Sequence, residues 1–284
     1  VCLFYAIATT MSAFSQIVTP IEIKGLSAWW CADSVQQESG TPVSFWNNLA
    51  NTTESVSQSV ADYSPTLIKD VAEVNNHSVL RFDGDDYLDG GNIMNVGNVG
   101  QTVIILGKTD KAVVSFYSKS VQAGSEGRVY YLYNNSVPHF QIQIGANNFV
   151  IKGENRLSTY ECNSTYINLS DAKMMFFQDK IGVQKISISQ IKSINTQYNF
   201  LIGAYNNAQG TVPPATNLYL IGDIAEMIFY NRPLSNIERQ SVENYLRSKY
   251  FPGTEREQFS LGGIIEQNYG FKPITLTVPE RSYF

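Results

Sequence analysis

The sequence predicts an all-β protein, a two-sheet antiparallel sandwich with one α-helix packed on it near the C-terminus. Three observations support this prediction. Short apolar runs of alternating polarity recur along the chain, turn-forming residues separate them, and one late segment has helical periodicity instead. No repeat of fixed period is visible in the sequence, which argues against a solenoid or a propeller.

The composition is that of a globular chain with a surface rich in hydroxyl and amide groups. Of its 284 residues, 43% are hydrophobic and 12% are aromatic, which is enough to bury a large core. The formal net charge is -5, only 16% of the residues are charged, and the sequence contains no block of Lys and Arg. Nucleic acid is therefore an unfavourable partner. We expect neutral, hydroxylated ligands instead.

The predicted strands are short apolar runs, most of them alternating with polar residues, that begin with the segment at Leu26. The clearest of them lie at 78–82, 102–106, 113–117, 129–133, 140–144, 149–151, 173–177, 184–188, 200–202 and 223–230. Residues that tolerate positive φ separate them, as at Asn134-Asn135 and Asn206-Asn207. Strands at this spacing indicate a sandwich or a barrel.

The one predicted helix begins after Ser235. Ser235 and Glu238 form the pattern of a capping box, and Pro252-Gly253 ends the helix. The apolar residues between these signals fall close to one helical face, and they are Ile237, Val242, Tyr245, Leu246 and Tyr250. We expect this face to pack on the sandwich.

The chain divides into three predicted parts. Residues 1–15 are uncharged, apolar and closed by small residues, which is typical of the remnant of a secretory signal peptide, with a buried first strand as the alternative. Residues 16–252 form the sandwich domain. Residues 253–284 begin with a polar linker. No other run approaches the roughly 18 apolar residues that span a bilayer, so we expect a secreted or cell-surface protein without a transmembrane segment.

Cysteine and histidine offer little chemistry. Once the leader with Cys2 is removed, Cys31 and Cys162 could pair in an oxidising compartment or lie apart in the core. We favour two separate core thiols, because a sandwich of this size needs no disulfide. His77 and His139 have no Cys or His at metal-binding spacing, so a zinc site or a Ser-His-Asp triad has almost no residues to use.

Aspartates after one strand form a candidate calcium site. Asp83, Asp85 and Asp86 surround Gly84, and Asp223 could contribute from another strand. Structural Ca²⁺ takes about six to eight oxygen ligands, which carbonyls would have to complete. Alternatively, these carboxylates cap turns through hydrogen bonds to the backbone. The sequence leaves both interpretations open.

Three blocks of sequence resemble the LamG-like, concanavalin A-like jelly-roll domains of exported bacterial surface proteins. The blocks are 26–33 with 43–48, 79–88 and 222–235, and the resemblance extends over roughly 26–250. It implies two antiparallel sheets, one curved, whose concave face binds sugar or protein in some relatives and is only structural in others. It also implies that structural calcium is common in the wider fold. The segment from Phe259 to Val278 resembles the opening strands of an Ig-like repeat, so further domains are expected in a longer chain.

The same superfamily includes glycoside hydrolases, which need two carboxylates on one sheet face. Asp223 and Glu226 are three residues apart, so on a regular strand they would point to opposite faces. We therefore predict that the protein is not an enzyme. Glu226 is expected to form a structural ion pair or hydrogen bond beside Arg232.

The predicted function is that of a non-catalytic carbohydrate- or matrix-binding module for adhesion, with a polysaccharide or a cell-surface glycan as its partner. A structural spacer without ligand is the alternative, and a glycoside hydrolase-like enzyme is less favoured. The candidate ligand-binding residues are the aromatic and amide side chains of Trp29, Tyr131, Tyr205, Asn206 and Asn207. Consecutive Trp29 and Trp30 must point to opposite faces of a strand. A concave face covered by the loop from Asn206 to Pro214 would favour the spacer.

Overall fold

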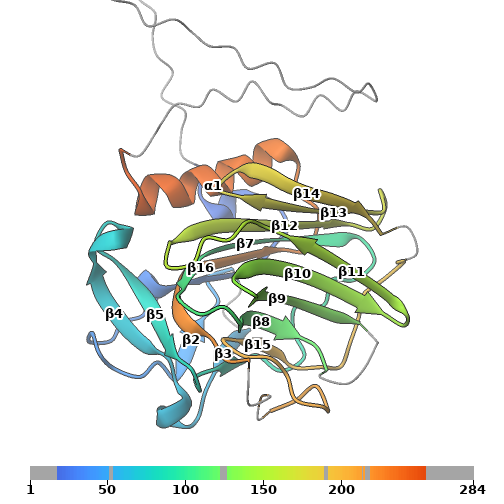
Figure 1. Cartoon of the computed structure of the whole chain (residues 1–284). Helices are drawn as coiled ribbons and strands as arrows, with labels where there is room; N and C mark the ends of the chain where they lie inside the picture. The colour runs from blue at the N-terminus through green and yellow to red at the C-terminus, as the bar shows by residue number, and fades with distance from the viewer. Residues whose placement is uncertain are drawn as a thin grey trace, which may run out of the picture. The chain divides into compact units, whose positions relative to one another are not determined.

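The computed structural model describes residues 18–50, 54–121, 127–188, 191–212, 214 and 218–253, and it confirms the two-sheet sandwich. Two antiparallel sheets face each other (Figure 1). Buried apolar side chains from both sheets fill the space between them. The predicted signal remnant at 1–15 and all but Gly253 of the predicted segment 253–284 lie outside the described residues. Within the described ranges, no helix has the length and apolarity to cross a membrane.

The first sheet carries the α-helix on its outer face. Its strands are β1 (Leu26–Cys31), β4 (Thr66–Val71), β5 (His77–Asp83), β7 (Gly100–Thr109), β12 (Glu161–Asn168), β13 (Lys173–Gln178), β14 (Ile181–Ser187) and β16 (Ile221–Tyr230). They follow the order β14-β13-β12-β7-β16-β5-β4, and β1 pairs with the second half of β16. β16 is therefore central, because it contacts β7 on one side and both β5 and β1 on the other.

The second sheet follows the order β11-β10-β9-β8-β15-β6-β3-β2. Its strands are β2 (Phe45–Asn47), β3 (Ser55–Ser57), β6 (Leu88–Asp89), β8 (Val114–Lys119), β9 (Arg128–Asn134), β10 (Val137–Ile144), β11 (Asn147–Lys152) and β15 (Phe200–Ile202). A short 3₁₀ turn, η1 (Pro20–Glu22), precedes β1, and three others lie between strands, namely η2 (Ala32–Ser34), η3 (Ala61–Tyr63) and η4 (Ala72–Val74). Each of the runs singled out in the sequence corresponds to a strand of one of the two sheets.

Strand β12 is not predicted from the sequence, although it lies between β7 and β13 in the first sheet. Glu161 and Asn163 point between the sheets, and Ser164 points outward to the helix. Both faces of the strand therefore carry polar side chains that are buried. Apolar alternation, which is the signal for a half-buried strand, is therefore missing. The short strands β2, β3 and β6 and strand β4 are likewise not predicted.

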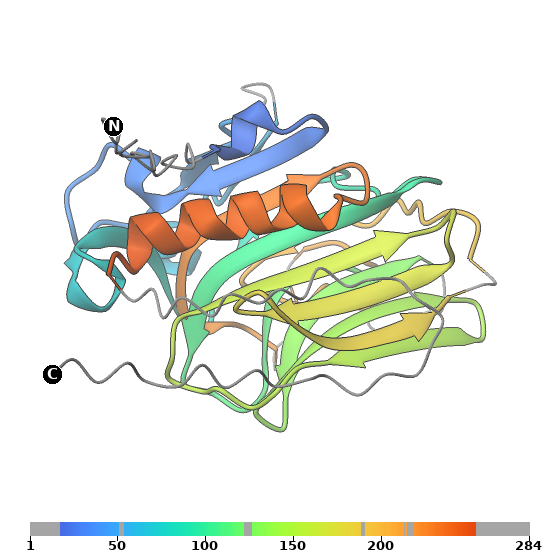
Figure 2. The same cartoon turned by 90° about the horizontal axis from the view of Figure 1, so that it is seen from above.

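The helix α1 (Asn236–Tyr250) begins where the capping box predicts. The Ser235 hydroxyl accepts a hydrogen bond from the Glu238 backbone N–H at 3.3 Å, and the Glu238 carboxylate accepts one from the Ser235 N–H at 2.9 Å. Figure 2 shows α1 lying lengthwise over the first sheet. Val242 and Leu246 are fully buried there. They belong to a cluster of apolar side chains between the helix and the first sheet, which we call the outer cluster and which also includes Ile104, Leu106, Ala225, Ile228, Tyr230 and Tyr250.

The buried face of α1 differs from the expected one at its first turn. Ile237, expected to be buried, is 78% exposed. Arg239 and Glu243 occupy the buried face instead and form an ion pair that is almost completely shielded from solvent. The Ser164 hydroxyl donates to Glu243 at 2.6 Å, and the Arg239 guanidinium lies over the Phe177 ring at 3.6 Å. The buried face of the helix therefore includes a charged pair, which a helical wheel based on apolar residues alone assigns to solvent.

Candidate functional site

An open pocket of about 310 Å³ lies at one end of the sandwich, where β5 ends, β7 turns into β8 and β16 begins. We call it the rim pocket, and its lining consists of Gly84, Lys111, Ala112, Val113, Val114, Tyr219 and Ile221. Gly84 has φ of 118°, a conformation that favours glycine, and a Cβ there would lie 3.1 Å from the Ile221 side chain. The turn after β5 can therefore approach the start of β16 closely enough to form one wall.

One tyrosine, Tyr219, lines the rim pocket. Tyr63 and Tyr87 belong to two segments joined by a backbone hydrogen bond, in which the Tyr87 N–H donates to the Tyr63 carbonyl at 3.1 Å. Burial raises the pKa of Tyr219, and the nearby Tyr87, Asp85 and Tyr63 raise it further. Tyr63 is 44% exposed, while Tyr87 and Tyr219 are half-buried. The lining of the pocket thus includes one partly exposed aromatic side chain, that of Tyr219.

The three predicted metal ligands after β5 do lie together beside this pocket. Carboxylate oxygens of Asp83, Asp85 and Asp86 all lie within 4.8 Å of one another. Asp83 and Asp85 are exposed, whereas Asp86 is buried and accepts a hydrogen bond from the Asp83 N–H at 3.0 Å. Burial raises the pKa of Asp86 to about 7, and the charges of Asp83 and Asp85 contribute in the same direction.

Asp223 does not join this group. It lies directly across the β5–β16 ladder from Arg81, whose guanidinium donates to both of its carboxylate oxygens at 2.8 and 2.9 Å. The Tyr160 hydroxyl donates to it as well, at 2.6 Å. Carboxylate oxygens are the ligands that Ca²⁺ prefers, so the three aspartates could contribute to a calcium site. Asp86 also accepts a hydrogen bond from the Asp83 backbone, as expected if these carboxylates cap the turn.

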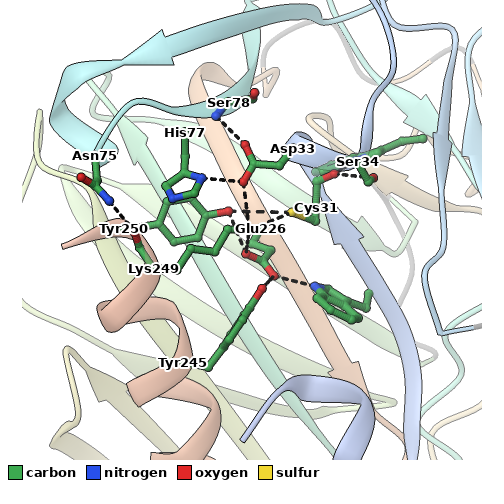
Figure 3. Close-up of polar contacts among 12 residues, drawn as sticks. Cys31, Asp33, Ser34, Asn75, His77, Ser78, Glu226, Tyr245, Lys249 and Tyr250 are labelled. Atoms are coloured by element: carbon green, nitrogen blue, oxygen red, sulfur yellow. Dashed lines mark hydrogen bonds and ion pairs between the residues drawn. The ribbon is translucent and has the colours of Figure 1, made fainter. Parts of the chain in front are cut away.

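A second polar cluster is buried under α1, and Glu226 of β16 is its centre (Figure 3). The fully buried Glu226 carboxylate accepts hydrogen bonds from Trp29 Nε1 at 2.5 Å, Tyr250 OH at 2.7 Å and Tyr245 OH at 3.0 Å. Lys249 Nζ lies 3.2 Å from the same carboxylate. One carboxylate thus joins β1 to two turns of α1.

The cluster continues from Lys249 to the start of η2 (Figure 3). Lys249 Nζ lies 3.0 Å from Asp33 Oδ2 and 3.2 Å from Cys31 Sγ, and His77 Nδ1 is 2.7 Å from Asp33. Burial raises the pKa of the Cys31 thiol to about 11, and the negative charge of Glu226 adds to the shift. The thiol is therefore protonated near neutral pH and is a poor nucleophile.

A bulge in β16 corrects the expected placement of the two acids. The register of β16 against β7 shifts between Ile224 and Glu226, so that Ala225 and Glu226 both point outward. Asp223 and Glu226 consequently lie on the same face, and the expectation of opposite faces is wrong. Glu226 does not pair with Arg232, whose guanidinium lies 2.6 Å from Glu238.

The two tryptophans point to opposite sides of β1, as expected. Trp30 is fully buried between the sheets and stacks on Phe200, with ring centroids 5.6 Å apart. Trp29 is half-buried in the outer cluster and meets Tyr245 edge to face. Tyr131, another candidate ligand residue, is 1% exposed, because its ring packs in the core between the sheets.

The amide-rich loop after β15 lies against the second sheet. Asn206 is fully buried, its Oδ1 accepts from the Ser118 hydroxyl of β8 at 2.5 Å, and its Nδ2 donates to the Asn199 carbonyl at 2.8 Å. Tyr205 is 5% exposed and packs on Tyr130. The half-buried Asn207 caps its own turn, because its Oδ1 accepts from the Gln209 and Thr211 N–H groups. This loop therefore covers part of the outer face of the second sheet.

The two cysteines of the described part are separate and buried. Cys31 and Cys162 are both free thiols. Burial raises the pKa of Cys162 well above its usual value. The interpretation of two unpaired core thiols is confirmed.

Comparisons with known proteins give the fold and no family. No family model matches the chain, and no curated protein matches it. Among solved structures, the binding domain of Paraclostridial Mosquitocidal Protein 1 is 8% identical at a TM-score of 0.53, over 78% of this chain and 52% of that one. Trypanosoma rangeli sialidase in complex with sialic acid is 11% identical at a TM-score of 0.53, over 83% of this chain and 35% of that one.

A third structure is more distant. The Ruminococcus gnavus IT-sialidase CBM40 bound to α2,3-sialyllactose is 16% identical at a TM-score of 0.40, over 50% of this chain and 81% of that one. The first two structures share the fold of this chain, which aligns with 52% of one and 35% of the other.

Proposed function

We propose that this domain is a non-catalytic carbohydrate-binding module of the LamG-like type, in a secreted or cell-surface protein of several domains, and that the rim pocket holds the glycan. The observation that carries the proposal is an open pocket lined by the half-buried Tyr219 and by Lys111. Tyrosine combines an apolar ring face with a polar hydroxyl, which suits the apolar face and hydroxyl rim of a sugar.

Lys111 in the lining and the carboxylates that flank Gly84 can add the hydrogen bonds that a sugar needs. Asp83 and Asp85 are exposed carboxylates that can accept hydrogen bonds from sugar hydroxyls, and Lys111 lines the pocket as a donor. The pocket volume of about 310 Å³ is at the lower end of small-molecule sites, which commonly range from about 300 to 1,000 Å³. One or two sugar rings of a longer glycan would fill it.

The surroundings of the two strand acids support a role without catalysis. A glycoside hydrolase needs a carboxylate pair that reaches the scissile bond. Asp223 is 2% exposed and accepts three hydrogen bonds from neighbouring side chains, whereas Glu226 is fully buried and accepts four. Both acids are therefore engaged by neighbouring side chains of the first sheet and α1.

A spacer without ligand is the second candidate, and the loop after β15 is the observation that favours it. Asn206 is bonded to β8 and fully buried, so this loop blocks part of the outer face of the second sheet. A spacer would need only this closed surface. The rim pocket lies elsewhere, at the end of β5, and remains open.

A glycan array probed with the full chain tests the proposal. We expect binding to a restricted set of glycans. Tyr219→Ala should weaken it by about fivefold or more, since stacking on an aromatic ring contributes on the order of 1 kcal/mol or more. Tyr166→Ala is the matched control, because this half-buried tyrosine pairs with Thr102, near the start of β7 and away from the pocket. Absence of binding to any glycan would favour the spacer, and equal losses in both variants would contradict the rim pocket.

A further inference from the structure

Aliphatic side chains form one part of the rim pocket. They belong to the turn before β8, to the start of β8 and to the first residue of β16, and they are Ala112, Val113, Val114 and Ile221. Val113 is 45% exposed, whereas Ile221 is half-buried. None of these side chains carries a polar atom. A ligand in the pocket therefore meets an apolar surface as well as the polar groups around it.

The polar groups of the lining are few. Among the described lining residues, the side chains of Lys111 and Tyr219 carry polar atoms. Two backbone groups are already engaged, because the Lys111 N–H donates to Thr109 Oγ1 at 3.1 Å and the Ala112 carbonyl accepts from the Ser136 N–H at 2.9 Å. A sugar hydroxyl placed against the aliphatic part would lose its hydrogen bonds to water without replacement, which is costly. A group without a hydroxyl fits there better.

The charges at this end of the sandwich have both signs. Lys111 is exposed in the lining, and the exposed Asp83 and Asp85 flank the lining residue Gly84 in the chain. These opposite charges work against a strong preference for either an acidic or a basic sugar. The aliphatic part of the lining is therefore the feature that can distinguish one neutral sugar from another.

We propose that the rim pocket selects N-acetylated sugars, such as N-acetylglucosamine, over sugars that carry hydroxyls alone. This inference rests on the proposed function, because it names the ligand class of the same site. The acetamido methyl is a small apolar group that can lie against Val113 and Ile221 without burying a hydroxyl there. The acetamido carbonyl can accept a hydrogen bond from the Lys111 ammonium, and the sugar ring can stack on Tyr219.

Calorimetric titration of the full chain with matched trimers tests the selectivity. The β1,4-linked N-acetylglucosamine trimer and cellotriose share one backbone and differ only in the acetamido groups. We expect cellotriose to bind about fourfold more weakly or worse, which is the ratio that burial of one additional methyl group gives. A galacturonate trimer is the acidic probe, and we expect it to bind more weakly than the N-acetylglucosamine trimer as well.

Val113→Thr locates the methyl contact. Threonine keeps the branched shape of valine but presents a hydroxyl to the pocket, so affinity for the N-acetylglucosamine trimer should fall about fourfold while affinity for cellotriose stays unchanged. Val99→Thr is the matched control, because Val99 is 47% exposed, close to the 45% of Val113, and precedes Gly100 at the opposite end of β7. Far-UV circular dichroism confirms that each variant is folded.

Each outcome decides one of the two proposals. Equal affinity for the N-acetylglucosamine trimer and cellotriose would overturn the acetamido preference and leave carbohydrate binding intact. Tighter binding of the galacturonate trimer, lost in Lys111→Met, would overturn it in favour of an acidic ligand. Equal losses in Val113→Thr and Val99→Thr would overturn the methyl contact. If none of the three probes binds while the array shows another glycan bound, the acetamido preference fails alone. If nothing binds in either experiment, both proposals fail.

Discussion

Asp223 and Glu226 lie on the same side of β16 although two residues separate them, because the bulge at Ala225 adds one outward-facing residue. Asp223 is held by Arg81 and Tyr160 at one end of the strand. Glu226 is held by donors from β1 and α1 at the other. The carboxylates of both acids therefore bind neighbouring side chains of the first sheet and α1.

Glu226→Gln should be strongly destabilising. The substitution keeps the shape of the side chain but removes a buried charge that four groups surround, including Lys249. Breaking a buried ion pair typically costs about 3 to 5 kcal/mol. Urea unfolding should therefore show a loss of about 3 kcal/mol. Glu73→Gln is the control, since Glu73 is 60% exposed beside Lys108 and its loss should cost less than about 1 kcal/mol. Equal effects would contradict the role of Glu226.

Trp29→Phe separates a packing role from ligand binding. The substitution removes the indole N–H that donates to Glu226 and leaves that buried carboxylate with one donor fewer. We expect the free energy of unfolding to fall by about 1 to 3 kcal/mol, with glycan affinity unchanged. Lost affinity in a protein of unchanged stability would instead place the ligand at Trp29.

The pKa of Asp86 predicts a pH dependence of stability. Its folded pKa of about 7 lies above the usual 3.8, so the folded state binds more protons than the unfolded state between these values. The contribution of Asp86 is therefore greatest below about pH 4 and is lost as the pH rises through 7. Asp86→Asn should remove this dependence, so that the variant exceeds the native protein in melting temperature at pH 8 but not at pH 4. Parallel pH profiles would contradict the assignment.

The calcium prediction is tested by melting the protein with added Ca²⁺ and with a chelator. A cation bound by Asp83, Asp85 and Asp86 would remove their mutual repulsion and raise the melting temperature above pH 7. Asp83→Asn should then abolish the rise. An unchanged melting temperature under chelation would leave turn capping by Asp86 as the role of this group.

Thiol labelling should follow unfolding. Cys31 is 4% exposed and Cys162 is 1% exposed, and burial keeps both thiols protonated. We expect an aromatic disulfide reagent to leave both unmodified in the native protein and to modify both in urea. A reducing agent should leave the melting temperature unchanged. Rapid labelling of the native protein would show that α1 opens readily.

The sequence predicts those features that depend on residues close together in the chain. The start of α1 follows from Ser235 and Glu238, which interact within one helical turn, and it is confirmed. The opposite orientation of Trp29 and Trp30 follows from strand geometry and is confirmed as well. The bulge at Ala225 has no such signal, because no glycine marks it.

The candidate site is harder to predict than the fold. The three aspartates lie within four residues of the chain and could be singled out, but Lys111 and Tyr219 are far apart in the sequence and line one pocket only because distant strands are paired. Tyr131, Tyr205 and Asn206 belong to types that bind sugars, but the same residue types also fill cores and cap loops. Burial, which the sequence does not report, decides between these roles.

The helix α1 determines where this domain can be cut. A recombinant fragment that stopped after β16 would expose Glu226 without Lys249, Tyr245 and Tyr250, and would open the apolar outer cluster to water. Such a fragment would aggregate instead of behaving as a smaller version of the domain. Expression boundaries and fusion partners should therefore be placed beyond Tyr250. Proteolytic cleavage in the 231–235 connection, between β16 and α1, should destabilise the sandwich domain.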